Sequence, residues 1–176
     1  MGMIQQFAEE KLIIGVLSTL PTGRQEIEDT LSAEFGAVDY LSREIDFIYS
    51  DYYVKEMGPG IKRFFYAFEK CVAPDRLADI KLRTNELEQV FAAEGRRRVN
   101  FDPGILNCSR LVLASTKDNM HRIPLRKGVY AEVTLVYMKK EFHPLLWTYR
   151  DYATETYRQI FSEIREIYRQ QLKQQR

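Results

Sequence analysis

The sequence predicts an α+β fold, in which a ferredoxin-like β-α-β-β-α-β core is followed by a C-terminal antiparallel hairpin extension and a closing helix. Three observations lead to this prediction. Strand-like runs and helical patterns alternate in the order β-α-β-β-α-β over about residues 11–102. Residues 120–138 alternate around a glycine turn as a hairpin does, and residues 153–172 carry an apolar stripe at three- and four-residue steps. We therefore expect a single domain over residues 1–176, with the extension and closing helix over about 105–172.

The core begins with a buried strand that leads into a helix. Residues 12–17 form a continuous apolar run, which is typical of a strand buried on both faces. Apolar residues at helical spacing then predict a helix over residues 23–35, which Gly36 ends in the left-handed conformation. Thr22 and Gln25 have the three-residue spacing of a capping box, so we expect their side chains to cap this helix.

The remainder of the core is predicted as strand, loop, strand, helix and strand. Residues 38–53 are rich in β-branched and aromatic side chains, and the tyrosines and glycines of residues 52–60 mark a loop. Residues 61–72 return as a strand. A second helix begins at Pro74–Asp75 and stops at Gly95, and residues 96–101 form the next strand.

After a further strand over residues 111–115, the hairpin of residues 120–138 has two alternative registers. A three-residue loop with Gly128 in the left-handed conformation places Arg122 opposite Glu132, whereas a two-residue loop pairs Ile123 with Glu132. The first register is favoured because it keeps one face aliphatic. The residues of that face are Ile123, Leu125, Val129, Ala131, Val133, Leu135 and Tyr137.

In this register, Tyr130 and Thr134 share the opposite face with the Arg122–Glu132 pair. Such a cross-strand pair is often a surface ion pair that contributes about 0.2–1 kcal/mol. Alternatively, this face lines a cleft in which the guanidinium binds a phosphate or carboxylate with two parallel hydrogen bonds. His121 falls on the aliphatic face, where a structural role is more common than a ligand role.

Two long segments resemble an uncharacterised prokaryotic family, domain-of-unknown-function family 4416. They read FDPGILNCSRLVLASTKDNMHRIPLRKGVYAEVTL (101–135) and WTYRDY (147–152), and the similarity extends over nearly the whole chain. The recurrent motifs of the family correspond here to Asp102-Pro103-Gly104, Lys117-Asp118, His121-Arg122, Tyr130, Glu132, Thr134 and Trp147-Thr148-Tyr149. The chain departs from the family at Ile105, Pro124 and Arg150, where aromatic residues and a proline would be expected. The resemblance implies no established activity.

Members of this family are sometimes labelled GTP-binding, and the sequence allows that label to be tested. A P-loop requires G-x-x-x-x-G-K-[ST], and no such stretch occurs. Residues 116–119 (TKDN) are similar to a guanine-reading Thr-Lys-x-Asp, but the aspartate comes one residue too early. The sequence therefore disfavours P-loop GTPase chemistry.

Composition disfavours several partners. Lys and Arg number 26 against 25 Asp and Glu, and this balance gives no general attraction to nucleic acid or to an anionic membrane. Cys71 and Cys108 are too few for a disulfide framework, and the first 20 residues lack the order of a signal peptide, so we expect a cytoplasmic protein that does not enter a membrane. The sequence leaves oligomerisation open.

The leading hypothesis is that a polar cleft binds an anionic, phosphate-bearing and nucleotide-like small molecule. The candidate ligand-binding residues are Asp102, Lys117, Asp118, His121, Arg122, Tyr130 and Glu132. Lys117 and Arg122 would hold the anionic group, while Asp118 and Glu132 would accept hydrogen bonds or hold a divalent metal. Whether the protein is an enzyme stays open, with metal-assisted hydrolysis as the first class to test. The alternative is a non-enzymatic interaction protein that uses residues 153–172 or an open sheet edge.

Overall fold

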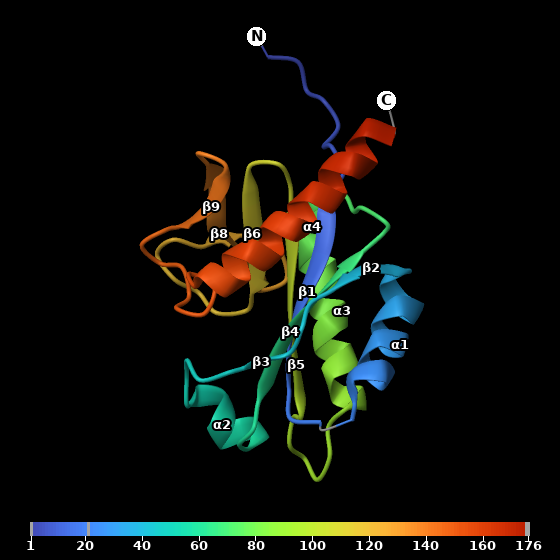
Figure 1. Cartoon of the computed structure of the whole chain (residues 1–176), viewed down its shortest axis with the longest axis vertical. Coiled ribbons are helices and arrows are strands. Elements are labelled where there is room, and N and C mark those ends of the chain that lie inside the picture. The colour runs from blue at the N-terminus through green and yellow to red at the C-terminus, as the bar shows by residue number, and fades with distance from the viewer. Residues whose placement is uncertain (1, 21, 175–176) are drawn as a thin grey trace.

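The computed structural model describes residues 2–20 and 22–174, which form an α+β fold with one large antiparallel sheet and a C-terminal helix (Figure 1). The coarse fold class predicted above is therefore confirmed. In chain order the elements are β1 (Lys11–Ser18), α1 (Arg24–Phe35), β2 (Val38–Leu41), β3 (Ile45–Asp46), α2 (Tyr52–Met57), β4 (Lys62–Phe68), a 3-10 turn (Pro74–Arg76), α3 (Leu77–Val90), β5 (Val99–Leu106), β6 (Arg110–Ser115), β7 (Ile123–Pro124), β8 (Tyr130–Met138), β9 (Glu141–Pro144) and α4 (Glu155–Gln174).

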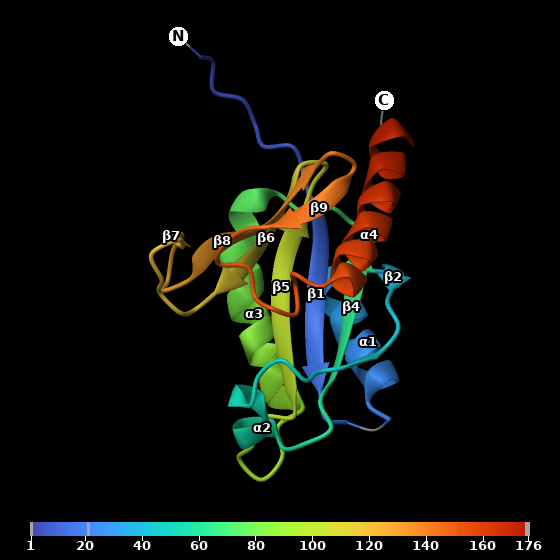
Figure 2. The ribbon, with the colours of Figure 1, turned by 60° about the vertical axis from the view of Figure 1, so that its left-hand side comes forward.

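The strands of the sheet follow the spatial order β2-β4-β1-β5-β6-β8-β7, and neighbouring strands run antiparallel. β3 adds to β4, and β9 adds to β8. Helices α1 and α3 cover one face, while α4 crosses the other (Figures 1 and 2). Because side chains alternate along a strand, Leu12 and Ile14 of β1 pack towards α1 and α3, whereas Ile13 packs towards α4.

The first helix lies where its periodicity predicts, but the predicted capping box does not form. α1 starts after Gly23 without a side-chain cap hydrogen bond, so the expected role of Thr22 and Gln25 is wrong. Gln25 instead donates to the Asp29 carboxylate, one turn further along α1. At the other end Gly36 has a φ of 96°, as expected for the residue after a helix.

Residues 38–60 are the part of the core that differs most from the prediction. The expected long strand is two short ones, β2 and β3, and the expected loop contains the short helix α2. Phe47 packs edge-on against Tyr53 at a ring separation of 5.8 Å. These aromatic side chains therefore build a small separate cluster beside the sheet, which strand propensity alone does not reveal.

The hairpin has the predicted three-residue loop. Ile123 pairs with Ala131, and Gly128 has a φ of 75°. The predicted aliphatic face, however, is interrupted by a β-bulge: Leu111 pairs with Leu135 and Val112 with Val133, which leaves Thr134 as an extra residue. Leu135 therefore packs on the α4 side rather than on the face that carries Val133, and the prediction that both share a face is wrong.

The closing helix packs against the chain's own sheet. The apolar stripe predicted for residues 153–172 is buried, at Tyr157, Ile160, Phe161, Ile164 and Tyr168. The stripe is thus occupied within the fold and does not offer the free surface that the interaction hypothesis assigned to it. None of the helices in residues 2–20 and 22–174 is long and apolar enough to cross a membrane.

Candidate functional site

The sheet splits between β5 and β6, and a cavity occupies the split. β5 pairs with β1 over its whole length, but it pairs with β6 only from Gly104 to Leu106. Pro103 accounts for the end of this ladder, because proline has no backbone N–H to donate. Beyond it the two strands diverge around a cavity of about 730 Å³, which α3, residues 47–56 and residues 149–152 also line.

Beyond Pro103, where β5 has no pairing with β6, two charged side chains of α3 bind the backbone of β5 instead. The Phe101 N–H donates to Glu88 Oε1 at 2.8 Å, and the Phe101 carbonyl accepts from Lys81 Nζ at 2.7 Å. Both side chains are buried, and burial raises the pKa of the Glu88 carboxyl above its ordinary value. Because Lys81 and Glu88 lie seven residues apart on one helix face, they present a donor and an acceptor as a neighbouring strand would.

A chain of hydrogen-bonded charges runs along the cavity wall from α2 to β5. Arg97 donates to Glu56 at 2.7 Å, to Glu88 at 2.9 Å and to Asn100 at 3.0 Å. Asn100 in turn donates to Asp102 Oδ1 at 2.9 Å. Arg97 and the neutral Asn100 therefore connect the carboxylates of Glu56, Glu88 and Asp102 along the wall.

The closed end of the cavity contains Arg63, which is 2% exposed. Its guanidinium lies 2.9 Å from Asp102 Oδ2 and 3.5 Å from Asp151 Oδ2. Burial would raise the pKa of Asp102, but the positive charges of Arg63 and Lys81 outweigh it and the pKa is lowered. For Asp151 burial dominates, and its pKa is raised. Two carboxylates with opposite pKa shifts thus flank one buried arginine.

The open rim of the cavity carries two exposed cations. Lys117 Nζ lies 4.1 Å from the centroid of the Tyr52 ring, and Arg150 lies beside Tyr149 in the sequence. Among the residues that the structure describes, neither cation makes an ion pair. Both charges are therefore available to an incoming anion.

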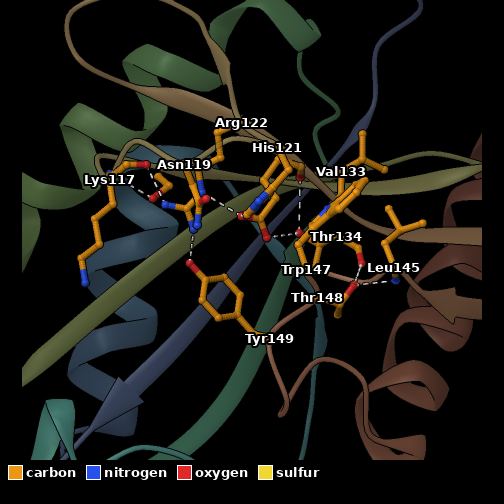
Figure 3. Close-up of polar contacts among 12 residues, drawn as sticks. Lys117, Asn119, His121, Arg122, Val133, Thr134, Leu145, Trp147, Thr148 and Tyr149 are labelled. Atoms are coloured by element: carbon orange, nitrogen blue, oxygen red, sulfur yellow. Dashed lines mark hydrogen bonds and ion pairs between the residues drawn. The ribbon is translucent and has the colours of Figure 1, made fainter.

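Behind the rim, Arg122 and Glu132 form the predicted pair. Arg122 Nε lies 2.8 Å from Glu132 Oε2, and both side chains are almost fully buried. The other guanidinium nitrogens donate to the Lys117 carbonyl at 2.6 Å and to the Tyr149 hydroxyl (Figure 3). Arg122 therefore connects the segments that carry Lys117 and Tyr149 to Glu132 of β8.

His121 completes this cluster. Its Nε2 lies 2.9 Å from Glu132 Oε2, and its ring stacks on Trp147 at 5.2 Å between centroids (Figure 3). Trp147 donates through Nε1 to the Val133 carbonyl at 2.8 Å. The expectation that His121 lies on the aliphatic face is wrong, because it lies in the turn before β7 and points to the carboxylate.

The structure brings some of the predicted site residues together and leaves others apart. Asp102, Lys117 and Glu132 line the cavity. Arg122 and His121 contact Glu132. Tyr130 lies in β8, where its backbone pairs with Ser115 of β6 and Pro124 of β7. Asp118 is exposed on the loop after β6. In residues 2–20 and 22–174, no group of three or more His, Cys, Asp or Glu side chains could hold a metal ion. Asp102, Asp118, His121 and Glu132 therefore do not converge on a metal site.

Sequence reasoning did not include seven charged residues that line the cavity, namely Glu56, Arg63, Lys81, Glu88, Arg97, Arg150 and Asp151. A signal was present for two of them. Lys81 and Glu88 lie on the same helical stripe as the buried residues Leu77, Ala78 and Ile80, where a charge requires a buried hydrogen-bonding role.

Comparison with known proteins identifies one family. The family model described as "Domain of unknown function (DUF4416)" matches residues 8–168. No curated protein and no solved structure matches the chain.

Proposed function

The chain belongs to the family described as a domain of unknown function (DUF4416), and we propose that its cavity binds an anionic, phosphate-bearing small molecule. One observation carries the proposal: Lys117 and Arg150 stand exposed at the rim of a cavity of about 730 Å³, and neither makes an ion pair with the described residues. Small-ligand sites are commonly clefts of about 300–1,000 Å³ with a few convergent polar groups. The proposal concerns binding and assigns no reaction.

The aromatic residues at the same rim support a ligand with a flat or nucleotide-like part. Tyr52 and Tyr149 are exposed, and both line the cavity, as the two cations do. Exposed aromatic rings gain free energy when a planar group stacks on them, and Tyr52 already contacts the Lys117 ammonium. In this proposal Lys117 and Arg150 hold the anion, whereas Arg122, His121 and Glu132 keep the rim segments in position.

A calorimetric titration with inorganic phosphate and with a nucleoside monophosphate, at low ionic strength, tests the proposal. We expect Lys117→Ala and Arg150→Ala each to weaken binding about tenfold or more, because a hydrogen bond to a charged group contributes about 1.5–3 kcal/mol. Lys70→Ala is the matched control, since Lys70 is exposed and does not line the cavity. Equal losses in all three variants, or no binding of either probe, would refute the proposal.

We also propose a topology for the core and a cellular location. The order β2-β4-β1-β5, with α1 and α3 as connections, supports a ferredoxin-like arrangement of the core. Cys71 and Cys108 are free thiols, which supports a cytoplasmic location.

A further inference from the structure

A second cavity, which is apolar, lies on the α3 face of the sheet between the start of α3 and strands β6, β8 and β7. It has a volume of about 360 Å³, and we call it the groove. Ile123 is 61% exposed and Leu125 is 42% exposed, so the fold leaves this apolar surface open to solvent. The residues that line the groove are Pro74, Leu77, Ile105, Arg110, Val112, Ile123, Leu125, Ala131 and Val133.

Residues 2–9, which we call the arm, also expose large apolar side chains. Met3 is 87% exposed, Ile4 is fully exposed and Phe7 is 68% exposed. Met3 and Phe7 lie on one side of the arm whether it is extended or helical, because four residues are an even number along a strand and about one turn of a helix. The arm therefore presents an apolar side whose burial would be favourable.

The arm starts at the end of the groove but is directed away from it. Glu10 Oε1 accepts from Arg110 of the groove at 2.8 Å, and the Glu10 backbone pairs with Val72. The Glu9 carbonyl, however, accepts from the Tyr168 hydroxyl of α4 at 2.8 Å, and α4 lies on the other face of the sheet. From there the arm runs past the end of the sheet and away from the body of the chain (Figures 1 and 2). It therefore points towards a neighbouring molecule rather than towards its own groove.

We propose that the groove binds the arm of a second copy of this chain, with Met3 and Phe7 as anchors, so that two copies exchange arms in a symmetric dimer. Each chain has one arm and one groove, and a two-fold arrangement therefore fills both grooves and covers both arms. The reach is sufficient. Residues 3–9 span up to about 23–25 Å when extended, whereas the three strands β6, β8 and β7 are only about 10 Å across.

This proposal is independent of ligand binding, because the groove and the larger cavity have different lining residues. Sedimentation equilibrium of the full chain, at about 1–500 μM, measures the association. Phe7→Ser removes an anchor of the arm, and Ile123→Thr makes the groove more polar while it keeps a β-branched side chain in β7. Ile48→Thr is the matched control, because Ile48 is 82% exposed and lies outside both surfaces. Urea unfolding at low chain concentration should give all three variants the wild-type midpoint, since the altered side chains are exposed in the single chain.

We expect the wild-type chain and Ile48→Thr to dimerise equally. Phe7→Ser and Ile123→Thr should each raise the dissociation constant about tenfold or more, because each substitution alters both arm–groove contacts of the dimer. A wild-type chain that stays monomeric over the whole concentration range, or equal effects of all three substitutions, would overturn the proposal.

An equimolar mixture of Phe7→Ser and Ile123→Thr tests the exchange of arms directly. A mixed dimer retains one intact contact, in which the unchanged arm of the Ile123→Thr chain fills the unchanged groove of the Phe7→Ser chain. The mixture should therefore associate more tightly than either variant alone. If mixing gives no gain, the arms are not exchanged between copies and the proposal is wrong.

Discussion

Replacing Glu88 with leucine tests whether α3 substitutes for the missing strand beside β5. The substitution leaves the buried Phe101 N–H without its acceptor, which costs about 1–3 kcal/mol. Arg97 also loses one carboxylate but keeps Glu56 and Asn100, so this half-buried contact adds less than about 1 kcal/mol. Leucine regains part of the loss, because it removes a carboxylate that burial disfavours. We expect a net destabilisation of about 2 kcal/mol.

Urea unfolding followed by circular dichroism measures this change, and amide hydrogen exchange of Phe101 localises it. Glu88→Gln should cost less than about 1 kcal/mol, since its side-chain carbonyl can still accept the Phe101 N–H. Glu86→Leu on the same helix is the surface control, because Glu86 is exposed and, among the described residues, pairs with Arg83 alone; its effect should stay within about 0.5 kcal/mol. Equal destabilisation by the leucine and glutamine variants of Glu88, or unchanged protection of the Phe101 amide, would refute the reasoning.

Three further predictions follow from the buried charges. Glu132→Ala should cost about 3–5 kcal/mol in urea unfolding, because it strands the buried Arg122 cation; a loss below about 1 kcal/mol would show that the pair is not a buried anchor. Gly15→Ala should cost about 1–3 kcal/mol, because its Cβ would displace Arg63; a neutral effect in the same assay would contradict the tight packing. The pKa of Asp102 is lower in the folded chain than its ordinary 3.8, so its stabilisation is present above that pH and is lost as the pH falls through the folded value. Asp102→Asn should accordingly flatten the loss of stability below about pH 4, and an unchanged pH profile would exclude this contribution.

Patterns of burial made much of the fold predictable from the sequence. Ile27 and Leu31 of α1 and the apolar stripe of α4 are buried as their spacing predicts, because a helix with one apolar face has one way to bury it. The hairpin register was predictable for a similar reason: Gly128 accommodates a positive φ, and a shift of one residue would have moved every side chain of β8 to the other face.

The bulge at Thr134 was not predictable, because an extra residue in a strand depends on which strand it pairs with. The pairing of β8 with β6 joins segments that are about 20 residues apart, and no local pattern specifies it. As a result, the sequence suggested one continuous aliphatic face. In the fold, Val129 and Val133 pack towards α3, whereas Leu135 packs towards α4.

The candidate site was predictable only where its residues lie near one another in the sequence. Lys117 and Glu132 belong to the same contiguous stretch, and both line the cavity. Arg63 lies between Lys62 and Phe64 in β4, where nothing in the local alternation distinguishes a buried arginine from an exposed one. Its position at the closed end depends on Asp102 and Asp151, which are 39 and 88 residues away.

The position of α4 bears on how the protein is made. Leu111, Leu135 and Phe142 of the extension meet Phe65 of the core in a cluster that α4 covers. Until the ribosome has synthesised residues 155–174, this apolar surface stays exposed to solvent. The three residue pairs between β5 and β6 are then the main strand-to-strand connection between the core and the extension. We therefore expect nascent chains that lack this helix to hold a formed core and a loosely attached hairpin, with the cavity between them not yet shaped.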